Sequence, residues 1–142
     1  MTEDEFITEL TKLNIEVTPE KLDQLKEYAS FLLEYNQHTN LTAIRDINEV
    51  YLKHFYDSLT IVKAINLKEV NTLLDIGTGP GFPGMVLKII YPHLQITLMD
   101  SNNKKISFLK ALAQELNLNV EIIYGRAEEF IVNRREYYDV VT

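Results

Sequence analysis

Cysteine and tryptophan are absent from this sequence of 142 residues, and positive charge is scarce, with 14 lysines and arginines against 21 acidic residues. Without cysteine the chain can form no disulfide, no thiolate metal site and no cysteine nucleophile. The three histidines, His38, His54 and His93, do not have the spacing of metal ligands. We therefore expect no metal site, and no catalytic acid–base pair or nucleophile stands out.

Long apolar runs are also missing, because no apolar stretch approaches the about 20 residues that a membrane helix needs. Three of the first five residues are acidic, unlike the start of a secretory signal, so we expect a cytoplasmic protein that does not bind membranes. The length allows one hydrophobic core. A net charge of −7 argues against a general nucleic-acid binder, but it leaves room for a local basic face.

The most informative stretch is residues 75–84, Asp-Ile-Gly-Thr-Gly-Pro-Gly-Phe-Pro-Gly. The apolar run before it, 72–76, has the character of a buried strand, and the run after it, about 83–91, has that of an amphipathic helix. Strand, glycine turn and helix begin a βαβ unit, in which Gly77, Gly79 and Gly81 bring bare backbone close to a ligand. A glycine motif alone is a weak signal, so its neighbours must decide.

A second strand, predicted at 95–99, is followed by Asp100, about 20 residues after the glycine turn, where an acidic residue typically accepts hydrogen bonds from a ribose. Pro80 and Pro83 each remove an N–H group that a pyrophosphate would use. Asp75 suits the ammonium and sulfonium charges of S-adenosylmethionine better than a phosphate. These features favour a class I methyltransferase over two alternatives, a dinucleotide enzyme and a βαβ module without activity.

The order of the remaining elements predicts an α/β fold with a Rossmann-like parallel sheet. Residues 1–70 have helical periodicity and form an amino-terminal helical segment, with Thr18 and Pro19 starting its second helix. Residues 71–142 form the cofactor-binding core, with a further helix at 103–117 and a third strand at 120–124. A fourth strand begins at 139–141, so we expect an incomplete core that stops after it.

The third amino-terminal helix is predicted to begin with Asp46 as its cap, paired with Glu49 in a capping box. His54, Asp57 and Ser58 lie within one turn of it. They could form part of a site edge, but a hydrogen-bonded cluster where the helices meet the sheet is the preferred interpretation.

Several segments together resemble the RsmG (GidB) family, the bacterial 16S ribosomal RNA guanine-N7 methyltransferases. The resemblance extends over nearly the whole chain, which corresponds to the amino-terminal part of these enzymes. The Gly-rich turn is shared with many methyltransferases, whereas two other segments are more specific: Asn-Leu-Thr-Ala at 40–43 and His-Phe-Tyr-Asp-Ser at 54–58. Asp100-Ser101 followed by Lys104-Lys105, and Gly125-Arg-Ala-Glu-Glu at 125–129, complete the resemblance.

The resemblance implies cofactor contacts at Gly77, Phe82, Ala127 and Glu128 for S-adenosylmethionine, beside Asp100 at the ribose. It also implies that Lys104, Lys105 and Arg126 face 16S ribosomal RNA in the small ribosomal subunit, although a solvated helix surface explains their spacing as well. A monomer is expected. The alternatives are a methyltransferase acting on a protein or small molecule, and a cofactor-binding module without activity.

Overall fold

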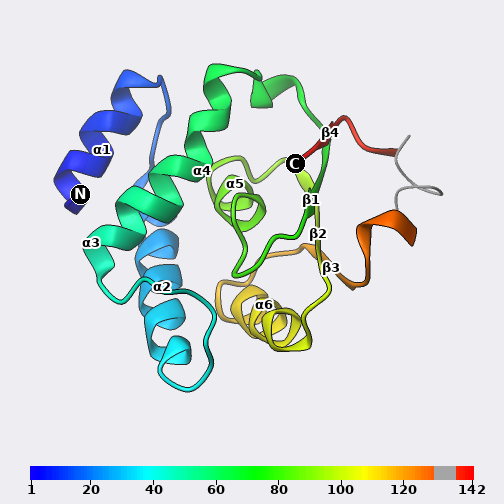
Figure 1. Cartoon of the computed structure of the whole chain (residues 1–142). Helices are drawn as coiled ribbons and strands as arrows, with labels where there is room; N and C mark the ends of the chain where they lie inside the picture. The colour runs from blue at the N-terminus through cyan, green and yellow to red at the C-terminus, as the bar shows by residue number, and fades with distance from the viewer. Residues whose placement is uncertain (130–136) are drawn as a thin grey trace.

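The computed structural model describes residues 1–129 and 137–142. Its centre is a parallel sheet of four strands in the order β3-β2-β1-β4 (Figure 1). The strands are β1 (Thr72–Ile76), β2 (Gln95–Asp100), β3 (Glu121–Tyr124) and β4 (Val140–Val141). The strand order reverses beside β1, whose neighbours are β2 and β4, and ligands of open α/β sheets bind at the carboxyl ends of the strands at such a point.

The register of the sheet follows from its buried aliphatic residues. Leu73 lies opposite Ile96 in the pairing of β1 with β2, and Leu73, Leu74 and Leu98 are fully buried. The predicted Rossmann-like fold is confirmed. β1 has the predicted bounds, β2 extends one residue further to include Asp100, and β3 begins one residue later than expected.

Two crossover helices cover one face of the sheet, α5 (Gly84–Ile90) and α6 (Asn103–Glu115). Both are shorter than predicted. α6 ends early because Asn117, just after it, has a φ of 52°, a left-handed conformation that stops a helix. At its other end Asn102 accepts hydrogen bonds from the backbone N–H groups of Lys104 and Lys105, which fixes where α6 begins.

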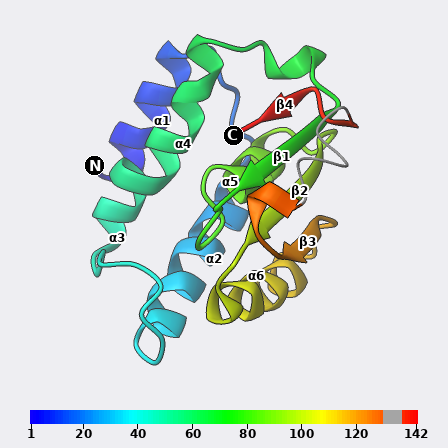
Figure 2. The ribbon, with the colours of Figure 1, turned by 45° about the vertical axis from the view of Figure 1, so that its right-hand side comes forward.

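The amino-terminal helices lie on the same side of the sheet as α5 and α6 (Figure 2). They are α1 (Glu3–Lys12) and α2 (Pro19–Asn36), and the predicted start of α2 is confirmed, since Thr18 caps it by accepting from the N–H of Lys21 at 3.3 Å. α2 contacts both α5 and α6. The helices therefore form a second layer over the crossover helices.

The segment after α2 is a sequence of short helical pieces: α3 (Ile47–Glu49), the π-helix η1 (Val50–Tyr56), α4 (Asp57–Leu59) and the 3-10 helices η2 (Thr60–Lys63) and η3 (Leu67–Glu69). The predicted capping box at Asp46 is wrong, because the side chain of Asp46 makes no capping hydrogen bond. α3 is only three residues long before the wider π-helical turns begin, so there is no regular first turn to cap.

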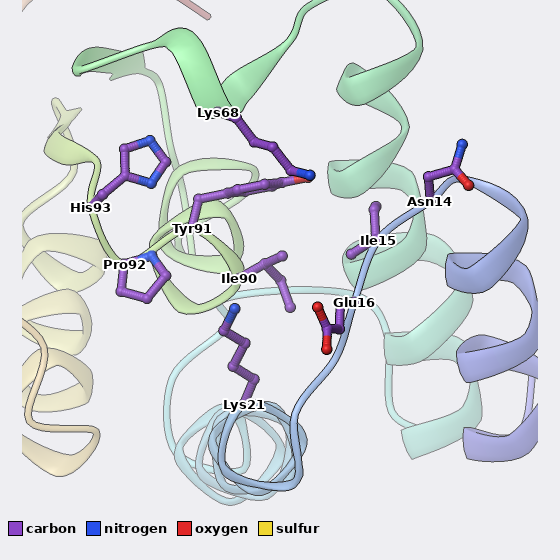
Figure 3. A pocket seen from close by; sticks show the side chains of 9 residues that line it. All are labelled: Asn14, Ile15, Glu16, Lys21, Lys68, Ile90, Tyr91, Pro92 and His93. Carbon is purple, nitrogen blue, oxygen red and sulfur yellow. The ribbon is translucent and has the colours of Figure 1, made fainter.

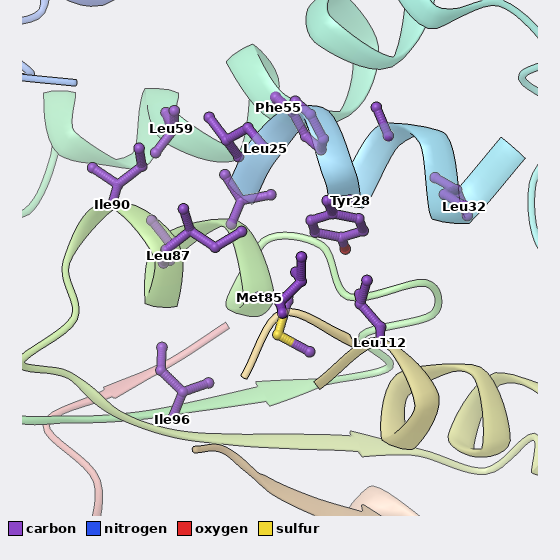
Figure 4. Packing of buried hydrophobic residues seen from close by; sticks show 14 of the residues in the cluster. Leu25, Tyr28, Leu32, Phe55, Leu59, Met85, Leu87, Ile90, Ile96 and Leu112 are labelled. Carbon is purple, nitrogen blue, oxygen red and sulfur yellow. The ribbon is translucent and has the colours of Figure 1, made fainter. Parts of the chain in front are cut away.

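One hydrophobic core runs from the amino-terminal helices to the sheet (Figure 4). Leu25, Leu32 and Phe55 from the helical segment pack in the same cluster as Met85 of α5 and Ile96 of β2. All five side chains are at most 3% exposed. The helical segment is thus packed directly on the crossover helices that flank the glycine turn.

Candidate functional site

The glycine turn joins β1 to α5 at the carboxyl edge of the sheet. Gly77, Gly79 and Gly81 have φ values of 66°, 59° and 108°, a region that side chains other than glycine rarely adopt. A Cβ atom added at Gly77 or Gly79 would meet no atom of residues 1–129 or 137–142 within 4 Å. The backbone at these two glycines therefore faces open space at the edge where the fold places a ligand.

Asp75, the residue before the turn in β1, is only 2% exposed and holds the turn together. One of its carboxylate oxygens accepts hydrogen bonds from the Thr78 hydroxyl at 2.6 Å and from the Gly84 N–H at 2.8 Å. The other oxygen accepts from the Thr142 hydroxyl at 3.1 Å. A Cβ at Gly84 would lie 2.9 Å from the Asp75 carboxylate, so only glycine allows this close approach of helix to strand.

Burial raises the pKa of the Asp75 carboxyl to about 6, against the lowering effect of its three hydrogen bonds. The folded-state pKa lies above the ordinary value of 3.8, so the stability contributed by proton binding is complete below about pH 4 and is lost as the pH rises through about 6. The carboxylate form is the one that a cationic ligand would favour.

Asp75→Asn tests this pKa, because asparagine can accept the bonds from Thr78 and Gly84 without carrying a charge. The unfolding free energy of the wild type minus that of the variant should fall by about 1–3 kcal/mol between about pH 4.5 and about pH 7.5. Urea denaturation of both proteins at both pH values measures this change. A difference that does not vary with pH would contradict the raised pKa.

Asp100, at the end of β2, reaches the other side of the turn. One oxygen of its carboxylate accepts from the Gly79 N–H at 2.9 Å, and the other accepts from the Asn102 N–H at 2.9 Å. The side chain is 8% exposed. Each carboxylate oxygen has two lone pairs, so Asp100 keeps acceptor capacity for the hydroxyls of a ribose.

On the side of the amino-terminal helices, the ring of Phe82 in the turn stacks on two rings from the helical segment. The ring of Phe82 stacks on Tyr28 of α2 with centroids 5.4 Å apart and on His54 of η1 with centroids 4.1 Å apart. The Tyr28 hydroxyl donates to the Pro80 carbonyl at 2.5 Å, and Tyr28 is fully buried. Tyr28 was not predicted from the sequence. The feature that could have indicated it is a tyrosine within the apolar stripe of α2, because a buried phenol hydroxyl requires a polar partner.

Of the predicted hydrogen-bonded cluster of His54, Asp57 and Ser58, the structure shows a hydrogen bond between Ser58 and His54 and leaves Asp57 outside it. The Ser58 hydroxyl donates to the backbone carbonyl of His54 at 2.6 Å, and the His54 ring instead bonds the Thr42 hydroxyl at 3.1 Å. Burial lowers the pKa of His54, against the raising effect of the Asp57 carboxylate. The structure therefore places His54 against the glycine turn and leaves Asp57 at the surface.

The residues after β3 return to the same edge. The Gly125 N–H donates to the Asp100 carbonyl at 3.1 Å, which holds the segment of Arg126, Ala127 and Glu128 beside the end of β2. Arg126 and Glu128 are exposed and Ala127 is half-buried. Lys104 is exposed and Lys105 half-buried in the first turn of α6, which follows Asp100 directly.

A pocket of about 340 Å³ opens at the edge of the sheet opposite the glycine turn, where Tyr91, Pro92 and His93 lead into β2 (Figure 3). None of the predicted site residues lines it. Over residues 1–129 and 137–142, no group of acidic or histidine side chains has the arrangement of a metal site. In that same part of the chain, no helix has the length and apolar character to cross a membrane.

Solved methyltransferase structures share this fold. A putative O-methyltransferase from Klebsiella pneumoniae aligns over 98% of this chain and 57% of its own, with a TM-score of 0.60 and 16% identity. A putative caffeoyl-CoA O-methyltransferase from Staphylococcus aureus aligns over 80% of this chain and 51% of its own, with a TM-score of 0.54 and 22% identity. At such identities the likeness concerns the fold alone.

Sequence comparison is more specific. The family model described as rRNA small subunit methyltransferase G matches residues 21–142. Curated relatives named ribosomal RNA small subunit methyltransferase G are 47% identical over 145 residues in Exiguobacterium sibiricum and 46% identical over 146 residues in Lactococcus lactis subsp. lactis. Each match covers 100% of this chain and 61% of the relative. The resemblance inferred from the sequence is confirmed, and the chain belongs to the rRNA small subunit methyltransferase G (GidB) family.

Proposed function

We propose that this protein transfers the methyl group of S-adenosylmethionine to N7 of a guanine in bacterial 16S ribosomal RNA. The observation that carries the proposal is the open backbone at Gly77 and Gly79 beside the Asp100 carboxylate, in a chain of this family. The substrate is the small-subunit RNA or the small subunit itself, in the cytoplasm. The names of the relatives support this choice of RNA.

We propose a cofactor site around the glycine turn. Asp100 accepts from the ribose hydroxyls, and the Asp75 carboxylate contributes negative charge toward the ammonium and sulfonium groups. The two prolines of the turn leave few N–H donors for a pyrophosphate, which favours S-adenosylmethionine over a dinucleotide. The proposed contacts are Asp75, Gly77, Gly79, Gly81, Phe82, Asp100, Ala127 and Glu128.

The amino-terminal helices have a supporting role in this proposal. Residues 71–142 form the cofactor-binding core, and residues 1–70 form a helical cover that fixes the turn. The hydrogen bond from Tyr28 to Pro80 and the stacking of His54 on Phe82 support these separate roles of the two segments. A turn held in one conformation binds a ligand with less loss of entropy.

The chemistry requires little from the side chains. Guanine N7 carries no proton and has a lone pair in the plane of the ring, so it can attack the sulfonium methyl directly. The carbon–nitrogen bond forms as the carbon–sulfur bond breaks, and the electron pair stays on sulfur as S-adenosylhomocysteine leaves. The protein aligns the two reactants, an effect that can contribute about 7–11 kcal/mol. No general base or metal is required.

The experiment is methyl transfer from radiolabelled S-adenosylmethionine to unmodified 16S RNA and small subunits, with large-subunit RNA as the control. Nuclease digestion and chromatography should place the label in 7-methylguanosine from the small-subunit RNA alone. Label in protein, in a small molecule or in another nucleoside would overturn the proposed substrate. Absence of transfer to any of them would overturn the proposed activity.

We also propose that Lys104, Lys105 and Arg126 contact phosphates of the RNA. Lys104→Ala should make the slope of log affinity against log salt less negative by about 0.7–0.9, because one phosphate contact is lost. Affinity for S-adenosylhomocysteine should not change. Lys12→Ala is the matched control, since it removes one charge from α1, where Lys12 pairs with Glu9 at 2.8 Å. Equal effects of the two variants would mean that only net charge matters.

A further inference from the structure

A pocket of about 320 Å³ adjoins the glycine turn on the side away from Asp100. This volume lies in the range of about 300–1,000 Å³ that is usual for small-molecule sites. The pocket borders the candidate cofactor site, because Thr142, which lines it, donates to Asp75 at 3.1 Å. Its walls are Asp57, Ser58, Thr60, Ile61, Phe82, Pro83 and Thr142.

The three hydroxyl groups that line this pocket each donate a hydrogen bond to another group of the protein. Ser58 donates to the His54 carbonyl at 2.6 Å, and Thr60 donates to the Asp57 carbonyl at 2.6 Å. Thr142 donates to the Asp75 carboxylate at 3.1 Å. Each hydroxyl oxygen can therefore only accept a further hydrogen bond. Among the described residues that line the pocket, the side chains offer acceptors to a ligand and no free donor.

Asp57 provides the charge of the pocket. It is exposed at the start of α4, where it acts electrostatically on the His54 ring: burial lowers the pKa of that ring, and the charge of Asp57 acts to raise it. Within the described ranges its carboxylate makes no hydrogen bond or ion pair. A carboxylate with two free oxygens can accept two parallel N–H donors. Among the four RNA bases, only guanine has two adjacent N–H donors on its Watson–Crick edge, at N1 and at the 2-amino group. Unstacked bases are commonly read on this edge.

We propose that this pocket receives the guanine that is methylated, with the Asp57 carboxylate accepting from N1–H and the 2-amino group. The proposal rests on the proposed function. N7 lies on the opposite edge of the purine, so a base held by Asp57 on its Watson–Crick edge leaves N7 free to face the cofactor. Phe82 and Pro83, which line the pocket, belong to the glycine turn itself, so a base in the pocket lies directly beside the turn. Asp57 is thus a specificity residue.

The test compares guanosine with inosine at the methylated position of the 16S RNA, since inosine keeps N7 and lacks the 2-amino group. With wild-type protein, inosine should lower kcat/KM by about 10-fold or more. Asp57→Asn, whose amide presents a donor in place of one oxygen, should lower kcat/KM on guanosine by a similar factor. The variant should then lose little more on inosine, because the interaction is already broken.

Asp46→Asn is the matched control, because it removes the same charge from a residue that is also exposed. The side chain of Asp46 makes no capping hydrogen bond. The control should behave as wild type, and Asp57→Asn should bind S-adenosylhomocysteine with unchanged affinity and melt at the same temperature. Equal activity of Asp57→Asn and wild type on guanosine would overturn the assignment, as would an undiminished effect of inosine in the variant. If wild-type protein transfers no methyl group to RNA, the proposed function itself fails.

Discussion

Replacing Gly77 by valine should weaken binding of S-adenosylhomocysteine by more than about 100-fold, a loss of roughly 2.7 kcal/mol. The space beside Gly77 contains no atom of the described residues within 4 Å, so the added side chain would fill the volume assigned to the ligand. The φ of 66° adds backbone strain, because a β-branched residue strongly disfavours the left-handed region. Calorimetric titration of the variant and the wild type measures the loss.

Asn117→Val separates the strain from the blocked volume. Asn117 also has a positive φ, 52°, but it lies just after α6, at the end of that helix remote from Asp100. The valine there should lower the melting temperature and leave the affinity for S-adenosylhomocysteine unchanged. Gly77→Val with wild-type affinity would show that the ligand does not approach the turn at this glycine.

Replacing Tyr28 by alanine should destabilise the protein by about 3–5 kcal/mol, as is usual for the loss of a fully buried aromatic side chain. The variant loses the stacking on Phe82 and leaves a cavity between α2 and the turn. Such a loss is a large part of the stability of a domain, so the variant would be partly unfolded at about 37 °C. Thermal and urea denaturation measure it.

Tyr28→Phe isolates the hydroxyl. It keeps the stacked ring and removes only the hydrogen bond to the Pro80 carbonyl, at a cost of about 1–2 kcal/mol. Because that bond holds the glycine turn, affinity for S-adenosylhomocysteine should also fall. Tyr51→Phe is the control, since Tyr51 is 3% exposed and its hydroxyl interacts with Glu3 of α1 rather than with the turn. An equal loss of affinity in both variants would contradict a specific role of Tyr28.

Much of the fold could be predicted from the sequence, because its parallel strands are short aliphatic runs that end at recognisable turns. Thr72–Ile76 had the predicted bounds, and Thr18 with Pro19 marked the start of α2 correctly. The segment from Asp46 was less predictable. It contains a π-helix and two 3-10 helices, and departures of this kind from α-helical spacing are set by packing rather than by the local sequence.

The candidate site also has parts that the sequence predicts and parts that it does not. The glycine turn, Asp75 and Asp100 were predicted as a cofactor site because glycine spacing and a carboxylate after the second strand are local signals with a physical meaning. In the structure Asp75 also has a structural role, because its oxygens accept hydrogen bonds from Thr78, Gly84 and Thr142 and so hold the two ends of the turn together. No spacing rule links residue 75 to residue 142.

The βαβ core, the place of the turn and the family of the chain could all be predicted from local patterns, because they depend on periodicity, glycine and characteristic segments. The stacking of Tyr28 and His54 on Phe82, and the pocket that Asp57 and Thr142 both line, became evident from the folded chain alone. These contacts join residues far apart in the chain. Their positions are fixed by the packing of α2 and η1 on α5 and the sheet, and no local pattern encodes that arrangement.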